Sequence, residues 1–369
     1  MVKNERNGYK MKKWNIGWGA IAACNMNCEF CYSKNKRKNI SSLTLSNWIN
    51  FIDENYNSIR SINYGTGESS MCNDWYTLIR YIKKKYPMIK QALTTNGYLS
   101  EKIKNNMFYD IVTECIDEID ISLDFGNSNK HNDLRGQKEA YRWAINTLEY
   151  CFSERKETTI VFLGSKKNLY EENIAELFKI AKNYDVKLRM NLYRPTDGIN
   201  QNSLCFIPDY QTIINIILFI YKNYKILAIN DPFFLALVAQ KGYDDPSGVN
   251  SLRILPNGDI TPSTYLIDTN YVIGNIKEHN ILDNIDEKLL QIITPYIPED
   301  CFNCILMSQC RGGLIDRRFL WYKTLKHKDP YCQGPYYNEC QLPAKIHLKK
   351  ASFNSIHDGY LPTMFFKNK

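Results

Sequence analysis

Six apolar, strand-like runs alternate with helix-like stretches through the first half of this 369-residue chain, and this alternation limits the possible folds more than any other feature. The periodicity predicts strands at 15–23, 61–67, 91–97, 118–125, 158–164 and 186–193, with helices at 44–57, 73–86, 100–115, 137–152 and 170–184. Strands separated by helices pair in parallel through right-handed crossovers, which gives an open or barrel-like sheet. In such sheets the active site forms at the carboxyl ends of the strands.

The pattern changes after residue 205. A helix is expected at 209–226, and the two short apolar runs around Asn257-Gly258 in "SLRILPNGDITPSTY" predict a β-hairpin. A group of cysteines follows the hairpin. We therefore predict five regions: an N-terminal tail (1–13), an α/β core (14–204), a helical linker (205–247), a small cysteine-ligated domain (248–345) and a C-terminal tail (346–369).

Charge and hydropathy exclude several classes of protein. The net charge is +8, but the lysines are spread along the chain without a dense basic block, so we expect no nucleic-acid partner. The most apolar run, "IINIILFIY" from Ile213, is too short to cross a membrane, and the N-terminus lacks the apolar core of a secretory signal. We therefore expect a cytoplasmic protein whose twelve cysteines stay reduced and serve as metal ligands or as buried side chains.

The stretch "CNMNCEFCYS" places Cys24, Cys28 and Cys31 directly after the first predicted strand, in the order C-x3-C-x2-C. Three thiolates that bind an iron–sulfur cube leave one iron without a protein ligand, and that iron can bind and activate a small molecule. The alternative is a zinc loop that takes a fourth ligand from elsewhere, although C-x3-C-x2-C is not a common zinc spacing.

This motif, with Phe30 just before the last cysteine, resembles the signature of the radical S-adenosylmethionine (radical SAM) enzymes. The resemblance implies a partial (β/α)6 TIM-like barrel and a [4Fe–4S] cluster whose open iron is chelated by SAM. It also implies that Phe30 contacts the adenine. In this family, one electron from the cluster cleaves SAM to methionine and a 5′-deoxyadenosyl radical, which abstracts a hydrogen atom from the substrate.

Two further stretches resemble SAM-binding motifs of the family. "YGTGES" ends the second predicted strand, and by this resemblance Gly65, Thr66 and Gly67 approach SAM while Glu68 accepts from its ammonium group. Without the resemblance it would be an ordinary glycine turn. "TTNG" (94–97) ends the third strand, as in many relatives.

"ISLDFGNSNKHNDLRG" follows the fourth strand and resembles the family's ribose motif. The resemblance implies that Ser122 and Asp124 face the SAM ribose and that Arg135 binds the methionine carboxylate. His131 is expected to be a polar neighbour of this site. The alternative for Arg135 is a surface ion pair.

Cys301, Cys304, Cys310 and Cys332 resemble part of the SPASM extension of radical SAM enzymes, which holds two auxiliary [4Fe–4S] clusters. Three expected ligands are missing: Ser263 and Leu314 occupy two of the positions, and "GYDDPSG" contains no cysteine. The resemblance therefore implies one auxiliary cluster and the loss of the other, so that the chain holds two [4Fe–4S] clusters in all. The alternatives are a zinc ion bound by the same four thiolates, and Cys340 in place of Cys332. The other cysteines, Cys72, Cys115, Cys151 and Cys205, are expected to be small buried hydrophobes, one of which could donate a hydrogen atom.

Relatives with SPASM domains mostly modify peptides or proteins. By this analogy we expect a ribosomally made precursor peptide as substrate and a flavodoxin or ferredoxin as electron donor. The reaction is expected to be epimerisation or crosslinking, and the resemblance of "WGAIAACNMNCEFCYS" to the epimerase-like branch of precursor-peptide enzymes implies epimerisation. Only about thirteen residues precede the first strand, so we expect no fused peptide-binding domain there. The alternatives are a radical SAM dehydrogenase or mutase for a small molecule, and a metal-stabilised binding module without enzymatic activity.

Overall fold

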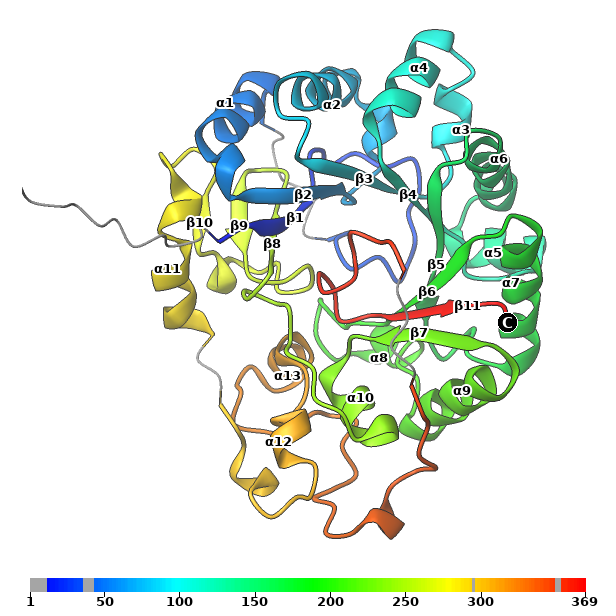
Figure 1. The fold of residues 1–369 in the computed structure, drawn as a ribbon, viewed down its shortest axis with the longest axis vertical. Helices are drawn as coiled ribbons and strands as arrows, with labels where there is room; N and C mark the ends of the chain where they lie inside the picture. The colour runs from blue at the N-terminus through cyan, green and yellow to red at the C-terminus, as the bar shows by residue number, and fades with distance from the viewer. Residues whose placement is uncertain (1–11, 36–42, 294–295, 349–352) are drawn as a thin grey trace, which may run out of the picture.

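The computed structural model of the protein describes residues 12–35, 43–293, 296–348 and 353–369, and Figure 1 traces its chain. Within these residues, eleven strands form one sheet in the order β10-β9-β8-β1-β2-β3-β4-β5-β6-β11-β7. Strands β1 to β6 are parallel neighbours in sequence order. The sheet curves around a central axis with helices on its outer side, which is the partial barrel that the sequence predicts (Figure 1).

All six predicted strands are present, and the strands run as follows: β1 Trp14–Trp18, β2 Ile59–Tyr64, β3 Lys90–Thr95, β4 Glu118–Ser122, β5 Glu157–Gly164, β6 Lys187–Leu192, β7 Lys225–Ile229, β8 Ser251–Ile254, β9 Asp259–Thr261, β10 Gly274–Asn275 and β11 Met364–Lys367. The helices are α1 Leu45–Asn55, α2 Asn73–Lys85, α3 Leu99–Lys102, α4 Asn106–Cys115, α5 Ser128–Arg135, α6 Ala140–Ser153, α7 Glu171–Asn183, α8 Gln201–Leu204, α9 Tyr210–Asn223, α10 Pro232–Ala239, α11 Ile285–Ile292, α12 Met307–Cys310 and α13 Ile315–Tyr322. Among the described residues, no helix has both the length and the apolar character needed to span a membrane.

Local signals explain where several helices begin and end. Thr44 and Asn47 form a reciprocal capping box at the start of α1. Asp231 accepts hydrogen bonds from two backbone amides at the start of α10, and Pro232 supplies the fixed φ that suits a first helical residue. The single helix expected at 100–115 is two helices, because Asn105 caps a new helix in its middle.

The first strand shows how the barrel is packed on both sides. Trp18 points outward and packs edge-on against Trp48 and Phe51 of α1, with ring centres 6.4 and 5.6 Å apart. Gly17 faces the interior, where a Cβ atom would lie 2.1 Å from the hydroxyl of Tyr360 and 2.7 Å from Nη1 of Arg253. The interior therefore has room for these two large side chains only because residue 17 is glycine.

Tyr360 belongs to a segment that we expected to be a C-terminal tail, and here the structure differs from the prediction. The chain before β11, coloured red in Figure 1, runs through the centre of the ring of strands. β11 then lies between β6 and β7, antiparallel to both. The apolar run Met364–Phe366 is fully buried there, since it packs on both faces of a sheet.

The same segment places a buried charged group in the barrel. His357 Nδ1 lies 3.2 Å from a carboxylate oxygen of Asp120 and 3.6 Å from one of Glu118, and Arg189 forms an ion pair with Asp120 at 2.7 Å. These side chains are at most 3% exposed. Arg189 supplies a cation to Asp120, and Glu118 accepts from the Ser355 hydroxyl and the Ile356 backbone amide. We therefore interpret the group as the anchor of the C-terminal segment.

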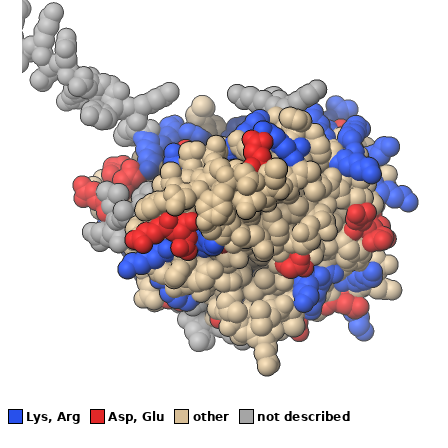
Figure 2. All heavy atoms as spheres, turned by 90° about the horizontal axis from the view of Figure 1, so that it is seen from below, with Lys and Arg blue, Asp and Glu red and all other residues tan. Residues whose placement is uncertain are grey.

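The predicted hairpin at Asn257-Gly258 is confirmed, since β8 and β9 are antiparallel. However, β8 also pairs in parallel with β1, so the hairpin extends the barrel sheet and does not stand apart from it. The boundary near residue 205 and the other domain limits stay predictions. Figure 2 shows acidic and basic side chains interspersed on one face of the molecule, without a dense basic block on that face.

Candidate functional site

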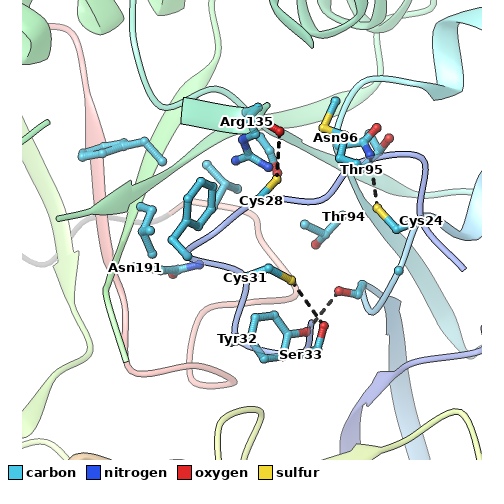
Figure 3. Close-up of a pocket in the computed structure, with 18 of the residues that line it drawn as sticks. Cys24, Cys28, Cys31, Tyr32, Ser33, Thr94, Thr95, Asn96, Arg135 and Asn191 are labelled. Atoms are coloured by element: carbon cyan, nitrogen blue, oxygen red, sulfur yellow. Dashed lines mark hydrogen bonds between the residues drawn. The ribbon is translucent and has the colours of Figure 1, made fainter. Parts of the chain in front are cut away.

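The three cysteines of the first motif line one cavity at the carboxyl ends of the strands, as the fold predicts. Cys24, Cys28 and Cys31 lie on the loop after β1, and the cavity also takes residues from the ends of β2 to β6 (Figure 3). It encloses about 980 Å³ including its open mouth. Ten of its lining residues are labelled in Figure 3.

Each thiol has polar neighbours. Asn96 Nδ2 lies 3.7 Å from Cys24 Sγ, Cys28 Sγ lies 3.6 Å from the carbonyl oxygen of Arg135, and Cys31 Sγ lies 3.5 Å from the hydroxyl of Ser33. Burial raises the pKa of Cys28 to about 11, and the Arg135 guanidinium acts in the opposite direction. A buried thiol of this kind becomes a thiolate when a bound metal replaces its proton.

The spacing of the thiols tests which metal group they fit. In a tetrahedral zinc site with Zn–S bonds of about 2.3 Å, the sulfur atoms lie about 3.8 Å apart. Among the described residues, no three cysteine sulfurs lie within 4.8 Å of one another; Glu118, Asp120 and His357 form the one group of three potential ligands that does. The three thiols of the first cavity and the four of the second offer the sulfur donors that iron–sulfur clusters use. Which metal group binds at either set stays a prediction.

Arg135 lines the cavity, and its environment excludes a surface ion pair. Its Nε and Nη2 atoms both lie 2.7 Å from Oδ2 of Asp124, whose side chain is fully buried. The guanidinium also lies 5.1 Å from the centre of the Phe30 ring, which lines the same cavity.

Asp124 and His131 are not among the described residues that line the cavity, and a contact between Asp124 and the SAM ribose stays a prediction. The other oxygen of Asp124 accepts from the backbone amide of Leu163 at 2.8 Å, so this carboxylate holds Arg135 and β5. His131 Nδ1 accepts from the Asp124 amide at 3.1 Å, and burial lowers the His131 pKa to about 3. His131 is therefore a neutral group behind Asp124.

Glu68 is also fully buried and lies behind the cavity wall. Its carboxylate accepts from the hydroxyls of Ser70 and Thr95 and from the Asn96 backbone amide, at 2.6 to 3.0 Å. Burial raises the pKa of Glu68, and these hydrogen bonds oppose that effect. In this structure Glu68 fixes the turn that presents Thr95 and Asn96, and a direct contact with an ammonium group stays a prediction.

Of the other residues predicted to contact SAM, some line the cavity and one does not. Ser122, Gly65 and Gly67 line the cavity, whereas Thr66 does not and instead lies 3.3 Å from the Tyr32 hydroxyl. Gly67 has a φ of +68°, and a Cβ atom there would lie 2.3 Å from the carbonyl oxygen of Ala23. The cysteine loop thus packs directly on the backbone of this glycine.

Sequence reasoning missed the far wall of the cavity. Asn191, Tyr193 and Arg194 follow or end β6, and Tyr265 follows β9. The position of the first three at the carboxyl end of a predicted strand was the available signal. Tyr265 has no such signal, because the contact depends on how the hairpin packs.

The C-terminal cysteines form a second site. Cys301, Cys304, Cys310 and Cys332 line one small cavity together with Lys328 and Asp329. Burial raises the pKa of Cys332 to about 11, and it also raises the pKa of Cys310. Cys340 is exposed and outside this cavity, so Cys332 is the better fourth ligand.

Cys115 and Cys151 are buried, as expected, and Cys72 is half-buried. Cys205 is exposed, so the expectation was wrong for this residue. It follows the short helix α8 at the surface, where its thiol donates to the carbonyl oxygen of Gln201. In the described structure none of these cysteines, nor Cys340, lines the first cavity.

Comparison with known proteins gives the following relatives. Residues 20–181 match the radical SAM superfamily. The chain is 23% identical over 306 residues to the antilisterial bacteriocin subtilosin biosynthesis protein AlbA of Bacillus subtilis (strain 168), over 78% of this chain and 64% of AlbA. The match therefore spans slightly less than two thirds of the length of that relative.

Among solved structures, Streptococcus suis SuiB bound to precursor peptide SuiA superposes with a TM-score of 0.67 at 18% identity, over 88% of this chain and 76% of SuiB. A histidine-tagged form of anSMEcpe with bound AdoMet also gives a TM-score of 0.67, at 16% identity over 87% of this chain and 91% of its own. At these identities the structures establish a shared fold. The superfamily match covers the loop with Cys24, Cys28 and Cys31, and this part of the chain, residues 20–181, is a radical SAM domain.

Proposed function

We propose that this protein is a radical SAM enzyme that modifies a ribosomally made precursor peptide. The observation that carries the proposal is the single cavity that Cys24, Cys28 and Cys31 share with Arg135, in a domain matched by the radical SAM superfamily. When an iron–sulfur cluster and SAM are bound, they supply one-electron cleavage of SAM to methionine and a 5′-deoxyadenosyl radical that abstracts hydrogen from the substrate.

The residues of this chain have separate tasks in that proposal. The three thiolates hold the cluster, and Asn96 donates to Cys24. Arg135, oriented by Asp124, binds the carboxylate of SAM through charge-assisted hydrogen bonds. Phe30 and Ser122 line the cavity where the adenine and ribose are expected to lie. Glu68 holds the Thr95–Asn96 turn against the cysteine loop.

The peptide substrate is supported by relatives. AlbA is a bacteriocin biosynthesis protein, and SuiB was solved with a precursor peptide. We further propose a second [4Fe–4S] cluster on Cys301, Cys304, Cys310 and Cys332, a flavodoxin or ferredoxin donor, and a cytoplasmic location in which the thiols stay reduced.

Gly67 offers a test of the cysteine loop. In Gly67→Ala the new methyl group would overlap the Ala23 carbonyl, so we expect the loop to shift and the iron content to fall by about half. Gly136→Ala is the matched control, because Gly136 has a similar φ of +61° but no atom within 4 Å of its Cβ position. It should lose about 1 kcal/mol of stability and keep its iron. Equal iron loss in both variants would show that backbone strain alone, and not the loop contact, is responsible.

The cavity also bears on which peptide reaction occurs. Epimerisation needs a hydrogen donor, and none of the five non-ligand cysteines lines the cavity in the described structure. Oxidative crosslinking needs an electron acceptor, for which the second cysteine site is available. The structure therefore supports crosslinking more than the epimerisation that the sequence favoured.

A reaction in deuterium oxide separates these outcomes. The substrate would be a candidate precursor peptide, with any short open reading frame beside this gene as the first choice, and its mass would be measured after turnover. Crosslinking or desaturation should yield a product lighter by two hydrogens. Epimerisation with an exchangeable donor should instead add about one mass unit at each inverted Cα. A peptide that remains unchanged while SAM is cleaved would favour the small-molecule alternative.

A further inference from the structure

The first cavity contains two arginines and no acidic residue among the described residues that line it. The two are Arg135 and Arg194, and each is held by a fully buried carboxylate that does not line the cavity, Asp124 for Arg135 and Asp316 for Arg194. The cavity is therefore built to accept negative charge at two positions.

Arg194 is fixed by an ion pair and a hydrogen bond, but these do not use all of its hydrogen-bond donors. It follows β6, and its side chain is 1% exposed. Its Nε donates to Asp316 at 3.2 Å, its Nη1 donates to the Leu192 carbonyl at 3.0 Å, and its guanidinium lies 5.4 Å from the centre of the Tyr265 ring. Its Nη2 makes no hydrogen bond with a described residue. One amino group thus remains for a ligand in the cavity that Arg194 lines.

The residues that hold Asp316, the partner of Arg194, come from positions where the SPASM pattern has cysteines and this chain does not. Asp316 is in the first turn of α13 and accepts from the Ser263 hydroxyl at 3.1 Å. Asp245, in "GYDDPSG", accepts from the Ile315 backbone amide at 2.9 Å. Ser263 and Asp245 therefore fix the first turn of α13, which carries Asp316. Both residues come from stretches where the SPASM pattern would have a cysteine.

A third arginine, Arg253, does not line the cavity but contacts Tyr32, which does. Arg253 is 1% exposed and forms no ion pair with a described carboxylate; its Nη2 donates to the Tyr32 hydroxyl at 3.1 Å. The rings of Tyr32 and Tyr265 are in edge-to-face contact at 5.5 Å, and both line the cavity beside Arg194. A buried cation without a counter-charge is costly, so an anion bound at this wall would be stabilised.

We propose that Arg194 forms a second carboxylate subsite, which binds an aspartate or glutamate side chain of the substrate next to the reacting position. The inference rests on the proposed function, in which SAM brings one carboxylate and Arg135 receives it. Arg194 is then available to orient the substrate, and a peptide with an acidic residue near the modified position is the expected substrate.

The test measures binding of two probes to the iron-loaded, SAM-saturated protein by equilibrium dialysis. The probes are N-acetylglutamate α-amide and its neutral isostere N-acetylglutamine α-amide. The wild type should bind the glutamate probe at least about tenfold more tightly, since charge-assisted bonds to arginine are worth at least that factor. Arg194→Gln should remove the preference, and Arg194→Lys should keep part of it, because it keeps the charge.

Arg135→Gln is the matched control for the other carboxylate. We expect Arg135→Gln to show the larger loss of SAM affinity and Arg194→Gln the larger loss of affinity for the glutamate probe. Iron content and the thermal midpoint of each variant establish that it is folded, and Arg194→Lys replaces Arg194→Gln if the latter is not. Equal binding of both probes by the wild type would overturn the inference. So would a larger loss of SAM affinity in Arg194→Gln than in Arg135→Gln, which would assign the SAM carboxylate to Arg194. Failure of the proposed function is distinguishable, because it would appear as the absence of SAM cleavage.

Discussion

After anaerobic reconstitution the wild-type chain should contain about eight irons and eight sulfides, and a variant with Cys24, Cys28 and Cys31 all changed to alanine should contain about four of each. The reason is that the seven proposed ligands lie in two separate cavities, three thiols in one and four in the other. Loss of one set should therefore leave the other cluster in place. Iron and acid-labile sulfide analysis on the same samples measures the change.

Two single variants make this result specific. Cys332→Ala should lower the iron content toward about four, because Cys332 lines the second cavity, whereas Cys340→Ala should keep about eight, because Cys340 is exposed outside it. A wild-type content near twelve irons would mean that a third cluster binds without the missing cysteines. About four irons with one zinc would mean that the C-terminal site is a zinc site.

The second large effect concerns stability. Arg317 is fully buried between two carboxylates, with Nη1 2.8 Å from Asp231 and Nε 2.9 Å from Asp329. Arg317→Met should lower the free energy of unfolding by about 3–5 kcal/mol, because it leaves two buried carboxylates unpaired. Asp231 also caps α10, and Asp329 lines the second cysteine cavity. The substitution should therefore destabilise both the helix and the second cysteine cavity. The measurement is the thermal midpoint of the anaerobic, iron-loaded protein.

The control is a neighbouring arginine on the surface. Arg311 pairs with Asp244 at 3.3 Å, but the two side chains are 66% and 78% exposed. Arg311→Met should therefore change stability by less than about 1 kcal/mol. A small and equal effect of both substitutions would contradict the network described around Arg317.

The periodicity of apolar residues predicted those parts of the fold that depend on residues close together in the sequence. The six parallel strands and their helices were predictable because burial on both faces produces short apolar runs. The carboxyl-end rule then placed Cys24 and Ser122 at one cavity, and the family resemblance added Arg135. β11 was not predictable in this way. Its sequence "MFFK" is short and terminal, and only pairing with β6 and β7, more than one hundred residues away, makes it a central strand.

The same limit applies to the site. The family resemblance pointed to Glu68, Asp124 and Arg135, but not to which of them lines the cavity, because that depends on where each buried side chain finds its donors. The position of Arg194 after β6 was visible in the sequence, but its pairing with Asp316 was not, because Asp316 lies 122 residues further along the chain. Ser263, identified only as a missing cysteine, is part of the network that holds this arginine.

The most direct test of the account is the fate of SAM. Reconstituted wild-type protein should be incubated anaerobically with SAM and dithionite, and 5′-deoxyadenosine and methionine measured by mass spectrometry, with Cys28→Ala as the control that retains the second cysteine site. We predict 5′-deoxyadenosine from the wild type and none above background from Cys28→Ala, because the cavity then lacks one of its three thiols. A wild-type protein that carries its iron and binds SAM but forms no 5′-deoxyadenosine would contradict this prediction.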